Sequence, residues 1–185
     1  MRVIAGSAKG ARLAAVPPGT RPMSDMAREG LFASLGSDVR GTRCLDLFAG
    51  TGAVGIEALS RGATEVVFVE RSARAVAAIR DNLARVRMDA VVVKADVERF
   101  LRGHLVAQGV FDIAFLDPPY ETPPAALEGL LSELAAGWLA PEGWTVMLTR
   151  GHKGPLPALP VHWAVRRQLR YGDSLLTLYR EERWA

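Results

Sequence analysis

Four consecutive residues, Asp117-Pro118-Pro119-Tyr120, combine groups that could hold a planar amine. A residue that precedes proline is driven into extended backbone angles, and here two successive residues do so. The chain should therefore leave its strand stiff and extended, with the Asp117 carboxylate and the Pro118 carbonyl projecting together. The amino group of a nucleobase presents two N–H donors to such paired acceptors, and an aromatic ring can stack on the base. The pattern indicates chemistry on a base amino group; the alternative is a stiff loop without a chemical role.

A second segment, Asp46 to Gly55, contains the complete pattern Gly-x-Gly-x-x-Gly. Gly50 and Gly52 permit a tight turn whose backbone approaches a ligand, and Gly55 permits close packing of a helix on a strand. Glycine turns of this kind also occur for packing alone. Because this one follows an apolar run and opens a segment of helical periodicity, the sequence favours a nucleotide-like ligand.

Acidic residues follow the next two predicted strands. Glu70 lies twenty residues after Gly50, where a carboxylate can accept hydrogen bonds from both ribose hydroxyls, although it could also be a solvated residue at a helix start. Asp96 could accept from an adenine amino group or cap the helix that begins at Val97. Both S-adenosylmethionine and a nicotinamide dinucleotide fit these acids. The tetrapeptide at 117–120 favours the former, since hydride transfer has no use for it.

A scaffold for these residues is visible between Arg43 and Thr149, where apolar runs alternate with segments of helical periodicity. This pattern is typical of a parallel sheet that is buried on both faces. We expect strands at 44–48, 65–69, 90–94, 111–116 and 144–149. Runs at 161–169 and 174–179, joined by Tyr171-Gly172-Asp173, predict a terminal antiparallel hairpin. The prediction is a doubly wound α/β fold with a mostly parallel, seven-stranded, Rossmann-like sheet.

The first forty residues are expected to be an extension of that core. Short strand-like pieces at 2–5 and 12–16 predict a small β-hairpin, and a helix should run from Ser24 or Asp25 to Leu35. We expect a single domain over 1–185, with an N-terminal extension at 1–40 and the catalytic core at 41–185.

The composition narrows the class of protein. Of 185 residues, 49% are hydrophobic and 23% are charged, which excludes a disordered chain. No apolar run reaches the roughly 18 residues of a membrane span, and the first ten residues do not resemble a signal peptide. A single cysteine excludes a disulfide framework, and the three histidines lack ligand spacing. We expect a cytoplasmic protein with no metal and no membrane contact.

The two motifs together carry a resemblance. The run from Asp46 to Gly52, followed by the tetrapeptide at 117–120, resembles S-adenosylmethionine-dependent methyltransferases that modify base amino groups. More narrowly, residues 2–10 and 21–32 are similar to the N-terminal signature of the RsmD family, and the likeness extends to 57–63 and Tyr171-Gly172. Members of that family are bacterial enzymes that methylate N2 of one guanine in 16S ribosomal RNA. The chain departs from the family pattern at Met23, where Thr is usual, and at Met26-Ala27.

The resemblance implies a methyl-donor site and a target-base site. The donor would lie over the glycine loop, its ribose on Glu70, and the amino group of the donor would meet Asp46 directly or through water. The implied donor-binding residues are Asp46, Phe48, Gly50, Gly52, Glu70, Arg71, Asp96 and Val97. The implied catalytic residues are Asp117, Pro118, Pro119 and Tyr120. The guanine would be turned out of the RNA, its amino group held by Asp117 and Pro118, and the product would be S-adenosylhomocysteine.

The charge distribution suggests where RNA would bind. Seven basic and three acidic residues lie in 1–43, nine and fourteen in 44–149, and seven and three in 150–185. Twenty of the 23 basic residues are arginine, a planar donor suited to phosphate, although codon bias could produce the same excess. We expect the following residues to engage the RNA backbone: Arg2, Lys9, Arg12, Arg166, Arg167 and Arg170.

Three other functions stay open at this point. A DNA adenine-N6 methyltransferase uses the same motif order, but 185 residues leave little chain for a sequence-recognition region. A non-catalytic RNA-binding protein with the same fold, and more distantly a nicotinamide-dependent enzyme, are the alternatives. The expected partner is 16S ribosomal RNA or the small subunit, and the expected state is a monomer.

Overall fold

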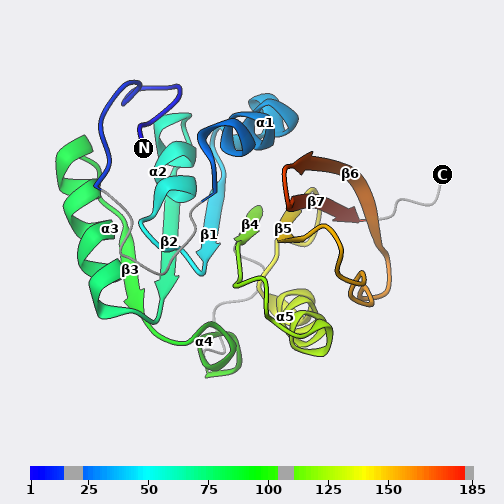
Figure 1. Cartoon of the computed structure of the whole chain (residues 1–185). Helices are drawn as coiled ribbons and strands as arrows, with labels where there is room; N and C mark the ends of the chain where they lie inside the picture. Colours follow the sequence, from blue (N-terminus) through cyan, green and yellow to red (C-terminus); the bar gives the residue numbers. More distant parts are fainter. Residues whose placement is uncertain (15–22, 104–110, 182–185) are drawn as a thin grey trace.

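A seven-stranded sheet forms the centre of the molecule (Figure 1). The computed structural model describes residues 1–14, 23–103 and 111–181. The strand order is β3-β2-β1-β4-β5-β7-β6, and only the pairings of β7 with β5 and β6 are antiparallel. The strands are β1 (Arg43–Leu47), β2 (Glu65–Glu70), β3 (Val91–Lys94), β4 (Ile113–Leu116), β5 (Thr145–Gly151), β6 (Trp163–Tyr171) and β7 (Ser174–Glu181). The predicted mostly parallel sheet with a C-terminal antiparallel hairpin is confirmed.

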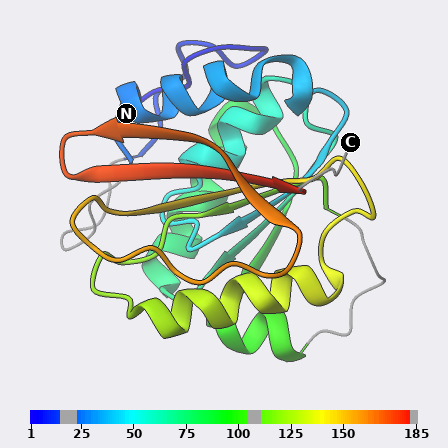
Figure 2. The same ribbon diagram turned by 90° about the vertical axis from the view of Figure 1, so that its right-hand side faces the viewer.

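Helices cover both faces of this sheet, as a doubly wound fold requires (Figures 1 and 2). One face packs against α1, α2 and α3, and the other packs against α4 and α5. The helices are α1 (Asp25–Leu35), the short 3-10 helix η1 (Gly36–Val39), α2 (Ala53–Ser60), α3 (Ala73–Val86), α4 (Val97–Gly103) and α5 (Pro124–Gly137). None of the helices in the described ranges has the length and hydrophobicity needed to cross a bilayer.

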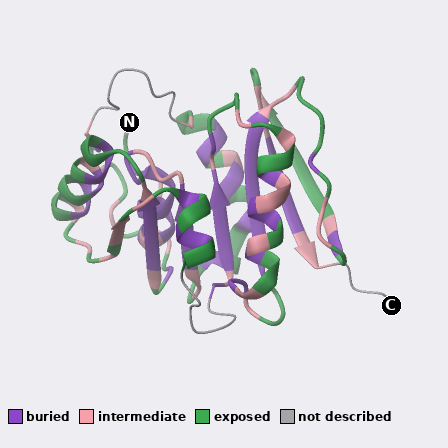
Figure 3. Cartoon of the chain, turned by 90° about the horizontal axis from the view of Figure 1, so that it is seen from below, coloured by how far each residue is buried: buried purple, intermediate pink, exposed green. Residues whose placement is uncertain are grey.

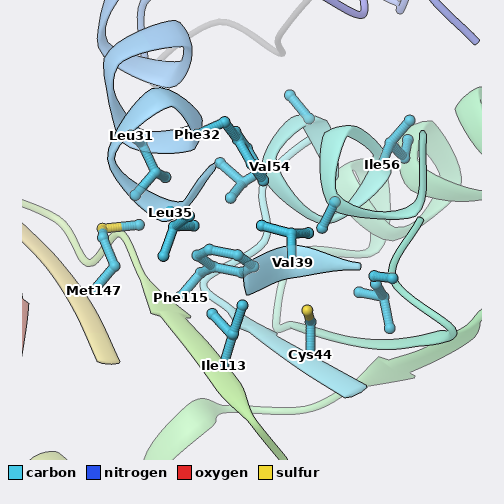
Figure 4. Close-up of a cluster of buried hydrophobic side chains, with 14 of the residues drawn as sticks. Leu31, Phe32, Leu35, Val39, Cys44, Val54, Ile56, Ile113, Phe115 and Met147 are labelled. Atoms are coloured by element: carbon cyan, nitrogen blue, oxygen red, sulfur yellow. The ribbon is translucent and has the colours of Figure 1, made fainter. Parts of the chain in front are cut away.

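Continuous apolar strands explain why the central sheet is buried on both faces (Figure 3). On the α1–α3 side, Phe32 of α1 lies with its ring centroid 5.9 Å from that of Phe115 in β4, within a cluster that includes Met147 (Figure 4). On the α4–α5 side, Trp138 lies 5.0 Å from Phe100, between ring centroids. These two cores fix the carboxyl edge of the parallel strands, where the motifs lie.

The N-terminal segment forms a short antiparallel pairing, as the predicted β-hairpin requires: the Val3 N–H donates to the Ala11 carbonyl at 3.0 Å, and the Leu13 N–H donates to the Met1 carbonyl at 3.2 Å. A single antiparallel bridge joins Arg2 and Arg12, and residues 15 and 16 of the second predicted strand lie outside the described residues. Beyond the paired residues, the backbone N–H groups of Ile4 and Ala5 donate to the buried Glu57 carboxylate of α2, at 2.7 and 3.0 Å. The segment is therefore a short hairpin whose connecting loop is anchored on α2.

Two residues of the family-like N-terminal signature have structural roles. Gly6 has φ +85°, and a Cβ there would come within 1.7 Å of the Ser60 carbonyl oxygen, so only glycine fits. Arg28 is fully buried in α1 and donates to the Arg2 carbonyl at 2.5 Å and to Asp25 at 3.0 Å. The helix begins at Asp25, one of the two predicted starts, and Ser24 is its N-cap, whereas residues 21 and 22 of the signature lie outside the described chain.

Candidate active site at the carboxyl edge of the sheet

The two sequence motifs lie side by side because their strands are neighbours. β1 and β4 pair in parallel, with Leu47 opposite Leu116, so the segments that follow them leave the same edge of the sheet. The strand order also reverses here, since β2 and β3 lie on one side of β1 and β4 and β5 on the other. Such a switch point is where open α/β sheets bind their ligands.

The glycines of the loop have different roles, since one leaves room for a ligand and the others permit close packing. Gly50 has φ +56°, and a Cβ there would meet only the Phe48 carbonyl oxygen, at 4.0 Å, so its backbone faces open space. Gly52 has φ +76° and lies against Phe68. At Gly55 a Cβ would come within 2.4 Å of the Phe68 ring, which confirms that this glycine permits close contact of α2 with β2. The loop can therefore admit a ligand above Gly50.

Glu70, at the end of β2, fastens the glycine loop to the start of α3. Its two carboxylate oxygens accept from the backbone N–H groups of Gly50, at 3.0 Å, and Ser72, at 2.8 Å. Each carboxylate oxygen can accept more than one hydrogen bond, so the group retains acceptor capacity toward a ribose. The loop and the predicted ribose acceptor are thus held in one fixed arrangement.

Asp46 lies beneath the same loop and is almost completely buried. Its Oδ2 accepts from the Gly55 N–H at 2.9 Å. Burial raises the pKa of Asp46 well above its usual value, and the charges of Asp117 and Glu70 raise it further. Three carboxylates therefore concentrate negative charge at the switch point, which favours a cationic ligand.

Asp96 fulfils the capping alternative that the sequence left open. Its Oδ1 accepts from the Arg99 N–H at 3.2 Å, at the start of α4. The Asp96 side chain is exposed, whereas Val97 is buried. A contact of either residue with an adenine stays a prediction, as do the roles of Phe48 and Arg71. Phe48 follows β1 with φ 60°, a left-handed conformation uncommon for a bulky residue.

The tetrapeptide is held by residues that the sequence did not single out. The Thr149 hydroxyl, buried on β5, donates to the Met147 sulfur at 3.3 Å and also faces the Asp117 side chain as a hydrogen-bond partner. Burial raises the pKa of Asp117 to about 6, although this hydrogen bond opposes the rise. The Tyr120 hydroxyl hydrogen-bonds the Ser174 hydroxyl, at the turn between β6 and β7. The sequence predicted that turn, at Tyr171-Gly172-Asp173, but not the contact of Ser174 with Tyr120.

Pro118 is buried, whereas Pro119 and Tyr120 are exposed. A base could therefore reach the Tyr120 ring from solvent. Within the described chain, no cluster of three or more His, Cys, Asp or Glu side chains is arranged to hold a metal ion.

The predicted RNA-binding residues are all exposed but form two separate groups. Arg2, Lys9 and Arg12 lie in the N-terminal loop, and the other group lies on β6, the edge strand, on the opposite side of α1 (Figure 1). Arg166 falls at an irregularity where the β6–β7 register moves from Val165 to Arg167. The two groups therefore lie on separate parts of the molecule (Figure 1).

Comparison with known proteins defines first a class and then a family. The architecture is the Rossmann-like fold, which this chain shares with a ribosomal protein L11 methylase from Lactobacillus delbrueckii subsp. bulgaricus, with TM-score 0.66 at 16% identity over 91% of this chain and 84% of that one. Residues 1–180 match the model described as "Conserved hypothetical protein 95", and the chain belongs to this family, the RsmD family.

Individual relatives span nearly the whole chain. Ribosomal RNA small subunit methyltransferase D of Escherichia coli (strain K12) is 35% identical over 98% of this chain and 90% of its own length. The solved structure of the Escherichia coli protein yhhF has TM-score 0.85 and 33% identity, covering 100% of this chain and 99% of that one. The resemblance seen in the sequence is therefore confirmed across the N-terminal loop, the core and the C-terminal hairpin.

Proposed function

We propose that the protein transfers a methyl group from S-adenosylmethionine to the N2 amino group of a guanine in small-subunit ribosomal RNA. The observation that carries this proposal is the position of Asp117 and Pro118 beside the glycine loop, at the strand-order reversal. The named relative from Escherichia coli supports ribosomal RNA as the substrate class. The finer assignment, to guanine N2, rests on the family resemblance of the sequence.

The donor site suits this ligand in shape and charge. The open backbone at Gly50 can receive the amino-acid part of the donor, and Glu70 can accept from the ribose hydroxyls. Asp46, together with its neighbouring carboxylates, favours a ligand that carries ammonium and sulfonium charges. S-adenosylmethionine, when bound, supplies an electrophilic methyl group that is bonded to its sulfonium sulfur.

The acceptor residues orient the amine and later accept its proton. The Asp117 carboxylate and the Pro118 carbonyl oxygen each accept one N–H, which directs the nitrogen toward the donor. No proton need leave beforehand, because the amine becomes acidic only when methylation makes it cationic. Asp117, with its pKa raised to about 6, is ionised at neutral pH and is a better proton acceptor than an ordinary carboxylate. Tyr120 stacks on the base.

RNA would reach this site with the target guanine turned out of the strand. We propose that the extension at 1–40 and the arginines of β6, within the catalytic core at 41–185, contact the phosphate backbone. The protein is expected to act in the cytoplasm as a monomer, on 16S ribosomal RNA or the small subunit, without a metal.

The test is incorporation of labelled methyl groups from S-adenosylmethionine into small subunits from a strain that lacks the enzyme. We expect label in N2-methylguanine after digestion to nucleosides. Label in adenine, or in duplex DNA but not in RNA, would instead support the adenine-N6 alternative. Binding of RNA without any transfer would support a non-catalytic protein.

A further inference from the structure

A cavity of about 550 Å³ opens next to the proposed target-base site. It is bounded by the segment from Tyr120 to Leu127, the loop from Arg150 to Pro155, and Asp173. Neither Asp117 nor Pro118 lines it, so it is a separate space that shares Tyr120 with the tetrapeptide. Figure 2 shows the loop after β5 running between α5 and the β6–β7 hairpin. Pockets that bind small molecules typically enclose about 300–1,000 Å³.

The loop that forms one wall is fastened at several points. Arg150 is only 8% exposed, and its guanidinium donates to the carbonyl oxygens of Gly151 and Gly154. The His152 N–H donates to the Asp173 carbonyl at 2.9 Å, and the Ala158 N–H donates to Glu128 of α5 at 3.0 Å. Because both ends of the loop are hydrogen-bonded to other elements, the cavity is present before any ligand arrives.

The lining suits a flat, largely apolar group with polar edges. Tyr120, Pro123, Pro124 and Pro155 present an aromatic ring and proline faces, surfaces on which a nucleobase can pack. The charged groups are Arg150, Lys153, Glu121 and Asp173, with His152 beside them. The carboxylates can accept from base amino groups, and the exposed Lys153 can meet a phosphate.

We propose that this cavity binds the nucleotide that adjoins the target guanine in the RNA strand. The inference rests on the proposed function, because it concerns the same substrate. Consecutive nucleotides are covalently linked, and Tyr120 belongs both to the tetrapeptide and to the cavity wall, so the cavity is within reach of a nucleotide joined to a guanine held at Asp117. In this arrangement a base that is not itself methylated stacks in the cavity. This contact contributes to the choice of the methylated site in the RNA.

The variant that tests this proposal most directly fills the cavity with a large side chain without straining the backbone. A Cβ at Gly151 would meet no atom within 4 Å, and its φ is not in the left-handed region, so Gly151→Trp can be accommodated and places an indole at the cavity wall. Gly129→Trp is the matched control, because Gly129 on α5 is equally open and does not line the cavity. Thermal unfolding and calorimetric binding of S-adenosylmethionine establish that both variants fold.

The experiment compares three RNAs: a fragment that the protein methylates, and the same fragment with an abasic nucleotide on the 5′ or the 3′ side of the guanine. For the unmodified protein we expect one abasic RNA to bind at least about fivefold more weakly, as the loss of one stacked base predicts. Gly151→Trp should bind the intact RNA as weakly as that abasic RNA and should not distinguish the two. Gly129→Trp should behave like the unmodified protein.

Two results would overturn the proposal. One is equal binding of all three RNAs by the unmodified protein, a measurement that needs no variant. The other is a Gly151→Trp protein that folds and still discriminates against the abasic RNA. Failure of the proposed function is distinct, since it would appear as the absence of guanine methylation in the intact RNA.

Discussion

The site has two halves, one that binds the methyl donor and one that binds the base that accepts the methyl group, and they are built in different ways. On the donor side, Glu70 binds Gly50 and Ser72, and Asp46 binds Gly55, so every contact lies within or between two segments that follow adjacent strands. On the acceptor side, the partners of Asp117 and Tyr120 come from β5 and from the start of β7. Donor binding should therefore survive changes that disable the acceptor half, whereas methyl transfer needs the C-terminal hairpin in place.

The largest effect is expected for Asp117→Ala, which separates the two halves. Removing a group that orients the amine should lower kcat by about 10²–10³-fold or more. The affinity for S-adenosylmethionine should fall by less than about tenfold, because the substitution removes one of three neighbouring carboxylates but leaves the glycine loop, Asp46 and Glu70 intact. Single-turnover methylation and calorimetry measure the two quantities.

Asp81→Ala is a suitable control for that substitution, since Asp81 is an exposed carboxylate on α3. It should change neither quantity. If the donor affinity of Asp117→Ala collapsed instead, Asp117 would belong to the donor half and the contrast between the halves would be wrong.

Glu70→Ala should show the reverse pattern. It removes the acceptor for the ribose and also the anchor of Gly50 and Ser72. Loss of hydrogen bonds to a charged acceptor predicts a dissociation constant for S-adenosylmethionine about 10- to 100-fold higher. Binding of RNA in the absence of donor should be unchanged, which a filter-binding titration measures. An equal loss of RNA affinity would mean that the two halves are coupled.

The same contrast explains which parts of the site were predictable. The glycine loop and the acid after β2 are local patterns next to apolar strands, and the structure places them together as the strand order requires. Thr149 and Ser174 carried no such signal, because they meet Asp117 and Tyr120 only through the register of β5 with β4 and β7. The cavity beside Tyr120 was invisible for the same reason, since its walls come from separate segments.

The N-terminal segment shows what sequence patterns could and could not predict. Its short antiparallel pairing was predicted, and the Val3 N–H donates to the Ala11 carbonyl. Its anchoring was not, because the carboxylate that accepts from the Ile4 N–H lies 53 residues later in the chain. Arg28 and Gly6, which carry part of the family resemblance, are explained by this anchoring.

The β6 arginines offer a test of the RNA-facing part of the acceptor half. Replacing Arg166, Arg167 and Arg170 by Gln should weaken RNA binding and lower the slope of log K against log salt by about one for each phosphate that the protein no longer neutralises. Donor affinity should not change. The matched control replaces Arg80, Arg85 and Arg87, which are exposed on or just after α3, by Gln. Equal slopes in both triple variants would mean that the β6 arginines do not contact the RNA backbone, and codon bias would then explain the excess of arginine.

The smallest expected effect is a shift in the pH dependence, and it tests the link between β5 and the tetrapeptide. Asp117 must be ionised to accept from the amine, so kcat/KM should fall below pH of about 6, by about tenfold per unit. The hydrogen bond from Thr149 lowers the pKa of Asp117, so Thr149→Val should raise that pKa and move the acidic limb to higher pH.

The free energy of unfolding should also depend on pH through the Asp117 carboxyl group, and the direction of the change can be predicted. The folded pKa of Asp117, about 6, exceeds the unfolded value of about 3.9, so the folded chain holds this proton more tightly. The contribution of Asp117 to the free energy of unfolding therefore decreases as pH rises from about 4 through about 6. In Thr149→Val this decrease should extend to higher pH together with the activity limb.

Thr177→Val, a buried substitution of the same kind on β7, should move neither curve, because Thr177 is not among the groups that set the pKa of Asp117. If the two curves moved apart in Thr149→Val, a group other than Asp117 would control the acidic limb of the activity.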